Sequence, residues 1–200
     1  MKIRPVVPKA RQVTEEQFYE QEDEDSPYQY LGGELVICEP VSDLHEDLFS
    51  FLVTLLRNFL DERGGAVAQG SRYPMRLDPK WSPEPDLMVV RDERRHLMGP
   101  QRLEGPADLV IEIVSPGDPR RALRLKLPRY REARVPEIWV VDPYKRSVRV
   151  EILEPAGYRS QEVTAGRLDA AAVPGFWIDV SWLWQRPLPP TLACVRQILG

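Results

Sequence analysis

Two acidic residues, Asp86 and Glu112, lie in or beside segments that the sequence predicts to be buried strands. Residues 109–114 read Leu-Val-Ile-Glu-Ile-Val, and a run that is apolar at both alternating sets of positions is typical of a strand covered on both faces. An ionised carboxylate in such a strand is costly unless a cation or hydrogen-bond donors compensate it. Asp86 follows Pro85 and enters the apolar run 87–90 directly. We therefore expect Glu112 to face a positive group and Asp86 to lie at the edge or end of a sheet.

Carboxylates in a chain with few imidazole and thiol groups favour a hard divalent cation. Magnesium and manganese prefer oxygen ligands, and this chain has only two histidines and two cysteines. A cation held by Asp86 and Glu112 could polarise a phosphodiester and lower the pKa of an attacking water. The pair therefore predicts metal-assisted hydrolysis of a nucleic-acid backbone. Two alternatives remain open, because Glu112 could be a structural acid paired with an arginine or with backbone amides, and Asp86 could be a turn residue.

A basic segment follows Glu112 in the sequence. Lys126 lies 14 residues beyond Glu112 on a predicted helix, from which its flexible amine could return over the strand's end. There it could orient water or offset developing charge. The alternative is that Lys126 is one solvated charge among its basic neighbours, which are Arg120, Arg121, Arg124, Arg129, Arg131 and Arg134. We expect Arg120, Arg121 and Arg124 to contact nucleic-acid phosphates.

The composition excludes several classes of protein. A net charge of −4 argues against a protein whose whole surface grips nucleic acid, but it permits a local basic groove. Cys38 and Cys194 are far apart and suggest neither a disulfide framework nor a structural zinc site. No apolar signal segment begins the chain, and no run approaches the roughly 18 apolar residues of a membrane span. We expect a cytoplasmic protein without a membrane partner.

The length favours a single domain, which we place at residues 28–186. Residues 1–27 contain an acidic run and are expected to form a flexible arm with one short helix near residues 14–19. Residues 187–200 begin with a proline cluster that is expected to end regular structure, leaving a proline-rich tail. Within the domain, Gly32-Gly33 predicts a turn between two short strands.

Two helices are predicted. Asp43 and Glu46 resemble a capping box, the following apolar residues recur at helical spacing, and Gly64-Gly65 provides the stop. A second helix is expected to follow Asp118-Pro119 and to run to about residue 134. Pro128 lies inside it and predicts a kink or a later start, because an interior proline removes a hydrogen bond.

Strands are predicted over residues 66–77, 86–90, 107–114, 137–141 and 147–153. The strand containing Glu112 is expected to be central. The strand at residues 147–153 has one solvent-exposed face and is expected to be an edge strand. Aromatic residues between 176 and 184 provide apolar area to dock on the core. The order of elements predicts a mixed α/β domain.

These residues occur in an order that resembles the Uma-two family of restriction-endonuclease-like proteins, a branch of the PD-(D/E)xK nuclease superfamily. The resemblance covers roughly residues 28–182 and rests on Gly33-Glu34-Leu35-Val36, His45, Pro85-Asp86, Ile111-Glu112-Ile113-Val114-Ser115-Pro116, Lys126 with Tyr130, and Val135-Pro136-Glu137-Ile138-Trp139-Val140-Val141-Asp142-Pro143. Each piece is weak alone, whereas the ordered set is specific.

The resemblance implies a restriction-endonuclease-like fold, in which helices flank a central mixed β-sheet. It implies Asp86 and Glu112 as metal ligands and Lys126 as the catalytic lysine. Because Val114 stands where the parent motif places lysine, the lysine function must have moved to the helix. Glu34 and His45 become secondary candidates.

The function implied is that of an endonuclease that hydrolyses DNA phosphodiesters with Mg²⁺ or Mn²⁺, as a homodimer with one site per strand. A different class of function is also open, namely a non-catalytic module that keeps the nuclease fold and binds nucleic acid or protein. A third possibility is a related phosphodiesterase that acts on RNA.

Overall fold

The computed structural model describes residues 11–21, 28–37, 42–70, 72–115 and 119–200, with only the backbone described at residues 21 and 119–121. The predictions for Cys38, for Asp118 and for most of the acidic run near residue 24 lie outside the described residues. So do those for the side chains of Arg120 and Arg121.

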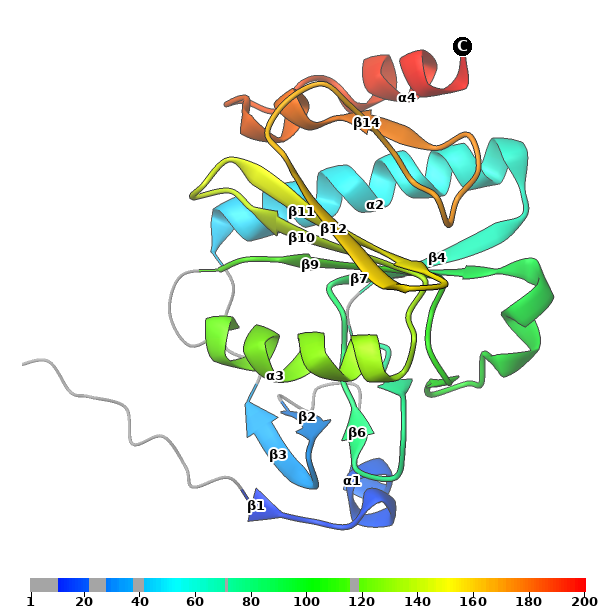
Figure 1. Ribbon diagram of the computed structural model, residues 1–200, viewed down its shortest axis with the longest axis vertical. Helices are drawn as coiled ribbons and strands as arrows, with labels where there is room; N and C mark the ends of the chain where they lie inside the picture. The colour runs from blue at the N-terminus through cyan, green and yellow to red at the C-terminus, as the bar shows by residue number, and fades with distance from the viewer. Residues whose placement is uncertain (1–10, 22–27, 38–41, 71, 116–118) are drawn as a thin grey trace, which may run out of the picture.

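A six-stranded mixed sheet forms the centre of the molecule, with the strand order β12-β11-β10-β9-β7-β4 (Figure 1). Its strands are β4 (Ala66–Gly70), β7 (Leu87–Arg91), β9 (Leu109–Ile113), β10 (Glu137–Asp142), β11 (Ser147–Glu154) and β12 (Gly157–Val163). The pair β9 and β10 is parallel, and the other neighbours are antiparallel. β9 is an interior strand whose five residues are all buried, as predicted for the strand that carries Glu112.

Two helices, α2 (Asp43–Arg63) and α3 (Pro119–Glu132), cover opposite faces of this sheet (Figure 1). The buried face of α2 packs on one side of β9, in the same cluster as Ile111. The buried residues of α3, among them Leu127 and Tyr130, pack on the other side with Val110. Each fully buried large apolar side chain contributes roughly 1.5–3 kcal/mol, so both faces of β9 are held firmly.

The helix boundaries differ in detail from the prediction. Ser42 caps α2, because its Oγ accepts a hydrogen bond from the His45 amide at 3.3 Å, so the assignment of the cap to Asp43 is wrong by one residue. The predicted stop is confirmed, since Gly64 has φ 68°. α3 begins at Pro119 and continues through Pro128, so the predicted later start is wrong.

A smaller four-stranded sheet lies on the far side of α3 from the central sheet (Figure 1). Its strands are β1 (Arg11–Gln12), β2 (Tyr28–Leu31), β3 (Glu34–Ile37) and β6 (Trp81–Ser82), in the order β1-β3-β2-β6. The β2–β3 hairpin turns at Gly32 and Gly33 as predicted, and both glycines have positive φ. Helix α1 (Glu15–Gln21) packs here through Phe18, which stacks on Tyr30. The described part of the N-terminal segment is therefore docked on the domain.

The remaining elements are β5 (Met75–Arg76), η1 (Asp92–Leu97), β8 (Leu103–Glu104), β13 (Arg167–Asp169), β14 (Trp177–Asp179), η2 (Val180–Trp184) and α4 (Thr191–Leu199). The single strand expected over 66–77 is two strands, β4 and β5. The aromatic segment docks on the core as predicted, with Phe176 and Trp182 buried. None of the helices in the described ranges combines the length and apolar character that crossing a bilayer requires.

Two predictions about the second half of the chain are wrong. β11 is not an edge strand, because β12 pairs with its outer side, and the mostly polar sequence of β12 gave no apolar alternation to predict it. Regular structure does not end at the proline cluster, because α4 follows it and buries Cys194, Val195 and Ile198.

Candidate active site

The register of the central sheet brings Asp86 beside Glu112. Leu87 on β7 lies opposite Ile111 on β9, so the residue before Leu87 lies next to the residue after Ile111. The Ile113 amide donates a hydrogen bond to Asp86 Oδ2 at 2.6 Å, which fixes that carboxylate against β9. The two acids predicted from separate segments therefore meet at one place in the fold.

Glu112 faces α3, and its side chain is enclosed. Its residue is only 4% exposed, which is the burial that the apolar pattern of 109–114 predicted. Lys126 Nζ lies 2.8 Å from each carboxylate oxygen. The Tyr130 hydroxyl donates a hydrogen bond to Glu112 Oε1 at 2.6 Å. The positive group expected opposite Glu112 is thus Lys126, and the alternative of an arginine partner is wrong for this residue.

Helix α3 supplies both partners from one face. Lys126 and Tyr130 are four residues apart, so their side chains lie one above the other on a helix. Lys126 is 5% exposed and is therefore not a solvated surface charge. Its amine also donates to the backbone carbonyl of Glu84 at 2.9 Å, which links α3 to the segment that leads into Asp86.

His45, on the first turn of α2, lies on the other side of Asp86. Its Nε2 is 3.2 Å from Asp86 Oδ1, and the residue is 5% exposed. The Nδ1 atom of His45 is buried and has no hydrogen-bond partner within the described residues. The Ser42 cap sets where this helix begins, and so it sets the position of His45 relative to Asp86.

The burial of these groups changes their acidities. Burial raises the pKa of Glu112; Lys126 opposes this increase and Asp86 adds to it. Burial and the Glu112 charge together raise the pKa of Tyr130 well above its usual value. Burial lowers the pKa of His45, but the hydrogen bond and charge of Asp86 outweigh it, so the net direction is upward. The raised pKa of Tyr130 keeps its hydroxyl protonated, and the raised pKa of His45 shifts that imidazole toward its protonated form.

The donor set suits a magnesium-type cation. Asp86 and Glu112 offer carboxylate oxygens, which are the ligands that Mg²⁺ prefers, and the Asp86 side chain is 21% exposed. Within the ranges that the structure describes, no three His, Cys, Asp or Glu side chains are placed to hold a metal ion together. Mg²⁺ is commonly bound by only one or two carboxylates, with water and phosphate as its other ligands.

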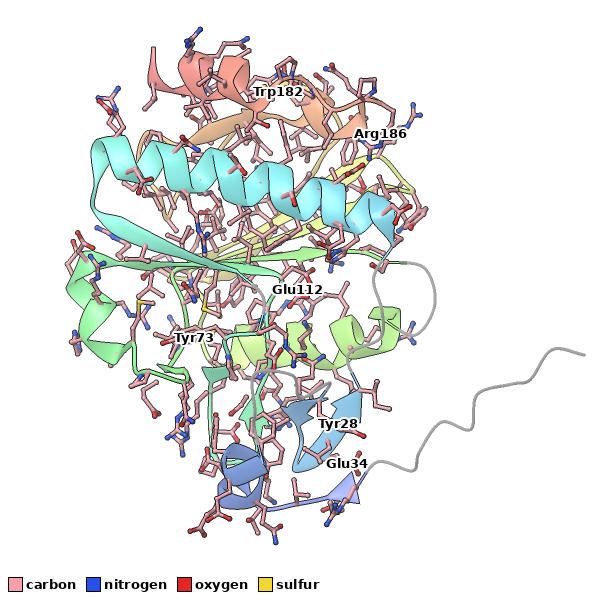
Figure 2. All side chains as sticks on the ribbon, turned by 180° about the vertical axis from the view of Figure 1, so that it is seen from behind. Tyr28, Glu34, Tyr73, Glu112, Trp182 and Arg186 are labelled. Atoms are coloured by element: carbon pink, nitrogen blue, oxygen red, sulfur yellow. The ribbon has the colours of Figure 1, made fainter. Side chains whose placement is uncertain are left out.

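Of the other predicted site residues, some lie in the site and others do not. His45 lies in the site, whereas Glu34 lies on β3, well away from Glu112 (Figure 2). Its Oε1 accepts a hydrogen bond from Gln12 Nε2 at 3.1 Å, and the structure does not bring Glu34 together with the other candidates. Arg124 is exposed on α3, and its contact with nucleic-acid phosphates stays a prediction.

Two contacts of the site were not predicted. Tyr130 was recognised as part of a motif, but its hydrogen bond to Glu112 was not foreseen, although its spacing from Lys126 is the signal for a shared helix face. The Glu84 carbonyl could not have been chosen from the sequence, because any backbone carbonyl can accept a bond and only the fold selects one.

A solved structure shows which class of fold this is. The crystal structure of a protein described as a "putative nuclease belonging to DUF820", from Anabaena variabilis ATCC 29413, superposes with a TM-score of 0.74 at 14% sequence identity. The match covers 86% of this chain and 97% of that one. The chain thus shares the fold of that protein, a mixed sheet with flanking helices.

The sequence model of the Uma2 family, described as "Putative restriction endonuclease", matches residues 15–181. The chain belongs to this family. Among proteins with curated descriptions, none matches the chain.

Proposed function

We propose that this protein is a divalent-metal-dependent nuclease that hydrolyses DNA phosphodiester bonds at the Asp86–Glu112–Lys126 site. The observation that carries the proposal is the contact between the Lys126 amine and Glu112, 2.8 Å apart, beside a second carboxylate on the neighbouring strand. A buried lysine and two acids at the rim of a nuclease fold supply both charges that phosphodiester hydrolysis requires.

Each residue of the site has its own role in the proposed hydrolysis. Asp86 and Glu112 would hold Mg²⁺ or Mn²⁺, which supplies a Lewis acid for the phosphate and acidifies a bound water. Lys126 offers an ammonium group to the charge that develops on the phosphate oxygens. Tyr130 holds the Glu112 carboxylate in place, and the Ile113 amide does the same for Asp86.

The test is cleavage of end-labelled substrates in the presence of Mg²⁺ or Mn²⁺. The panel contains supercoiled DNA, linear duplex DNA, single-stranded DNA and RNA, because the site chemistry suits any phosphodiester. We expect metal-dependent cleavage of DNA by the intact chain. Glu112→Gln, Asp86→Asn and Lys126→Met are each expected to reduce the rate by about 100-fold or more, as the loss of a transition-state charge contact does.

Matched controls separate catalysis from folding. Glu151→Gln alters a carboxylate that is 2% exposed and bonded to Arg131. Its strand β11 is separated from β9 by β10, so cleavage should persist. Lys80→Met removes an exposed lysine and should also be silent. Cleavage of RNA alone would replace DNA as the substrate. If the folded, metal-loaded chain cleaves nothing, the non-catalytic binding module is the better account.

A further inference from the structure

An aromatic residue flanked by two cations projects from the turn between β10 and β11. Tyr144 is 46% exposed, which makes it one of the few large apolar side chains of the described residues that are left open to solvent. Lys145 and Arg146 follow it, and both are exposed. A ring and two cations at one tip combine the features that bind a nucleic-acid strand, because bases stack on aromatic faces and phosphates attract cations.

The turn is held in one conformation. Asp142 Oδ1 accepts hydrogen bonds from the amides of Tyr144 and Lys145, at 3.0 and 3.1 Å. Arg146 has φ 53°, the left-handed conformation that closes the turn, and Asp142 pairs with Ser147 across it. A rigid turn loses little conformational entropy when its exposed side chains bind a partner.

The turn lies at the same rim of the sheet as the candidate active site. β9 and β10 are parallel, and Val140 lies directly beside Glu112, so the turn begins just beyond the level of that carboxylate. The β10–β11 turn and the starts of α2 and α3 occupy the same side of the molecule, at the left of Figure 1. Ligands of open α/β sheets bind at the carboxyl ends of parallel strands, and the turn is part of this end.

The distance suits a nucleic-acid strand that leaves the site along this rim. Tyr144 comes four residues after Val140, which places it roughly 10–15 Å from Glu112 at about 3.3 Å per strand residue. A stacked strand rises about 3.4 Å per nucleotide, so this span corresponds to about three or four nucleotides.

We infer that the turn of Tyr144, Lys145 and Arg146 binds a single-stranded flank of the substrate, with a base stacked on Tyr144 and phosphates at the two cations. This inference rests on the proposed nuclease function. A single strand is favoured over intact duplex because the bases of a duplex are already stacked on one another and do not offer their faces. The overall charge of −4 makes such a local basic contact more important to binding.

The test is the affinity of the protein for fluorescein-labelled 20-nucleotide single strands and 20-base-pair duplexes, measured by anisotropy in chelator so that no metal-dependent cleavage intervenes. We expect the intact chain to prefer the single strand. Tyr144→Ala should weaken that binding by roughly 5- to 100-fold, whereas Tyr144→Phe, which keeps an aromatic face, should bind normally. Changing both Lys145 and Arg146 to Ser should reduce the slope of log affinity against log salt by about 1.4, at roughly 0.7 per lost phosphate contact.

Two controls and the cleavage assay make the outcome decisive. Leu192→Ala removes an exposed apolar side chain on α4, and Arg57→Ser removes an exposed cation on α2; both should bind like the intact chain. Normal single-strand binding by Tyr144→Ala, or a preference for duplex, overturns this inference, and DNA cleavage by the same preparation would leave the nuclease proposal standing. An intact chain that neither binds nor cleaves any nucleic acid overturns both.

Discussion

At the scale of the residue, the tolerance of Glu112 inside the sheet depends on its contacts with Lys126 and Tyr130. A buried carboxylate is stable as an anion only where a cation and hydrogen-bond donors replace water, and these two side chains supply both. The cluster of Glu112, Lys126 and Tyr130 therefore contributes to the stability of the fold as well as to the proposed hydrolysis.

Lys126→Met should lower the free energy of unfolding by about 3–5 kcal/mol at neutral pH, because it leaves an uncompensated charge on the buried Glu112. Adding Glu112→Gln to that variant should recover part of the loss, since the uncompensated charge is then gone. Urea unfolding of the four members of this double-mutant cycle measures the effect. Losses that simply add would mean that the two side chains do not interact.

At the scale of the element, Tyr158 joins the edge strand β12 to the segment between α3 and β10. Its hydroxyl donates a hydrogen bond to the Val135 carbonyl at 2.7 Å, and burial is the main cause that raises the pKa of Tyr158 to about 12. The folded chain therefore keeps a proton that the unfolded chain releases above pH 10. Stability should fall as the pH rises from about 10 to about 12.

Tyr158→Phe should make this alkaline loss of stability smaller, although it removes one hydrogen bond and so costs about 1 kcal/mol at neutral pH. Urea midpoints at pH 8, 10 and 11 compare the two chains. Tyr130 also has a raised pKa and will keep some pH dependence in the variant. Equal slopes for the two chains would show that Tyr158 titrates alike when folded and unfolded.

Elements with strong apolar periodicity were predictable, and those stabilised by tertiary contacts were not. The apolar face of α2 and the doubly apolar run of β9 identified both elements from the sequence. The polar strand β12 is held by its ladder to β11, and that interaction leaves no apolar pattern in the sequence. Helix α4 does have buried residues at helical spacing, but it follows a proline cluster that indicated the end of regular structure. The carboxylate side chains of Asp86 and Glu112 indicated metal binding from the sequence alone. The backbone carbonyl of Glu84 could be identified as a partner of Lys126 only from the fold.

At the scale of the whole molecule, α3 lies between two sheets, and the N-terminal helix helps to hold the smaller one. The Tyr19 hydroxyl lies 2.7 Å from Ser82 Oγ, and Arg76 forms an ion pair with Glu15. Ser82 leads directly into the segment that carries Asp86. The contacts of α1 therefore help to fix the segment that carries Asp86. A flexible arm would make no such contacts.

Phe18→Ala should lower the free energy of unfolding by about 3–5 kcal/mol, because Phe18 is 2% exposed and stacks on Tyr30. Chemical denaturation measures this change, and Glu16→Ala, at an exposed position of the same helix, is the matched control. Unchanged stability of the Phe18 variant would mean that this helix is a detached arm in solution.

The claim on which the function depends is that Asp86 and Glu112 together bind a divalent cation. Isothermal titration of Mg²⁺ into the metal-free chain tests it most directly, with Glu112→Gln and Glu151→Gln measured under the same conditions. We predict saturable binding of one ion per site that disappears in Glu112→Gln and persists in Glu151→Gln. Equal binding by the intact chain and folded Glu112→Gln, or no binding by the intact chain, would contradict the account.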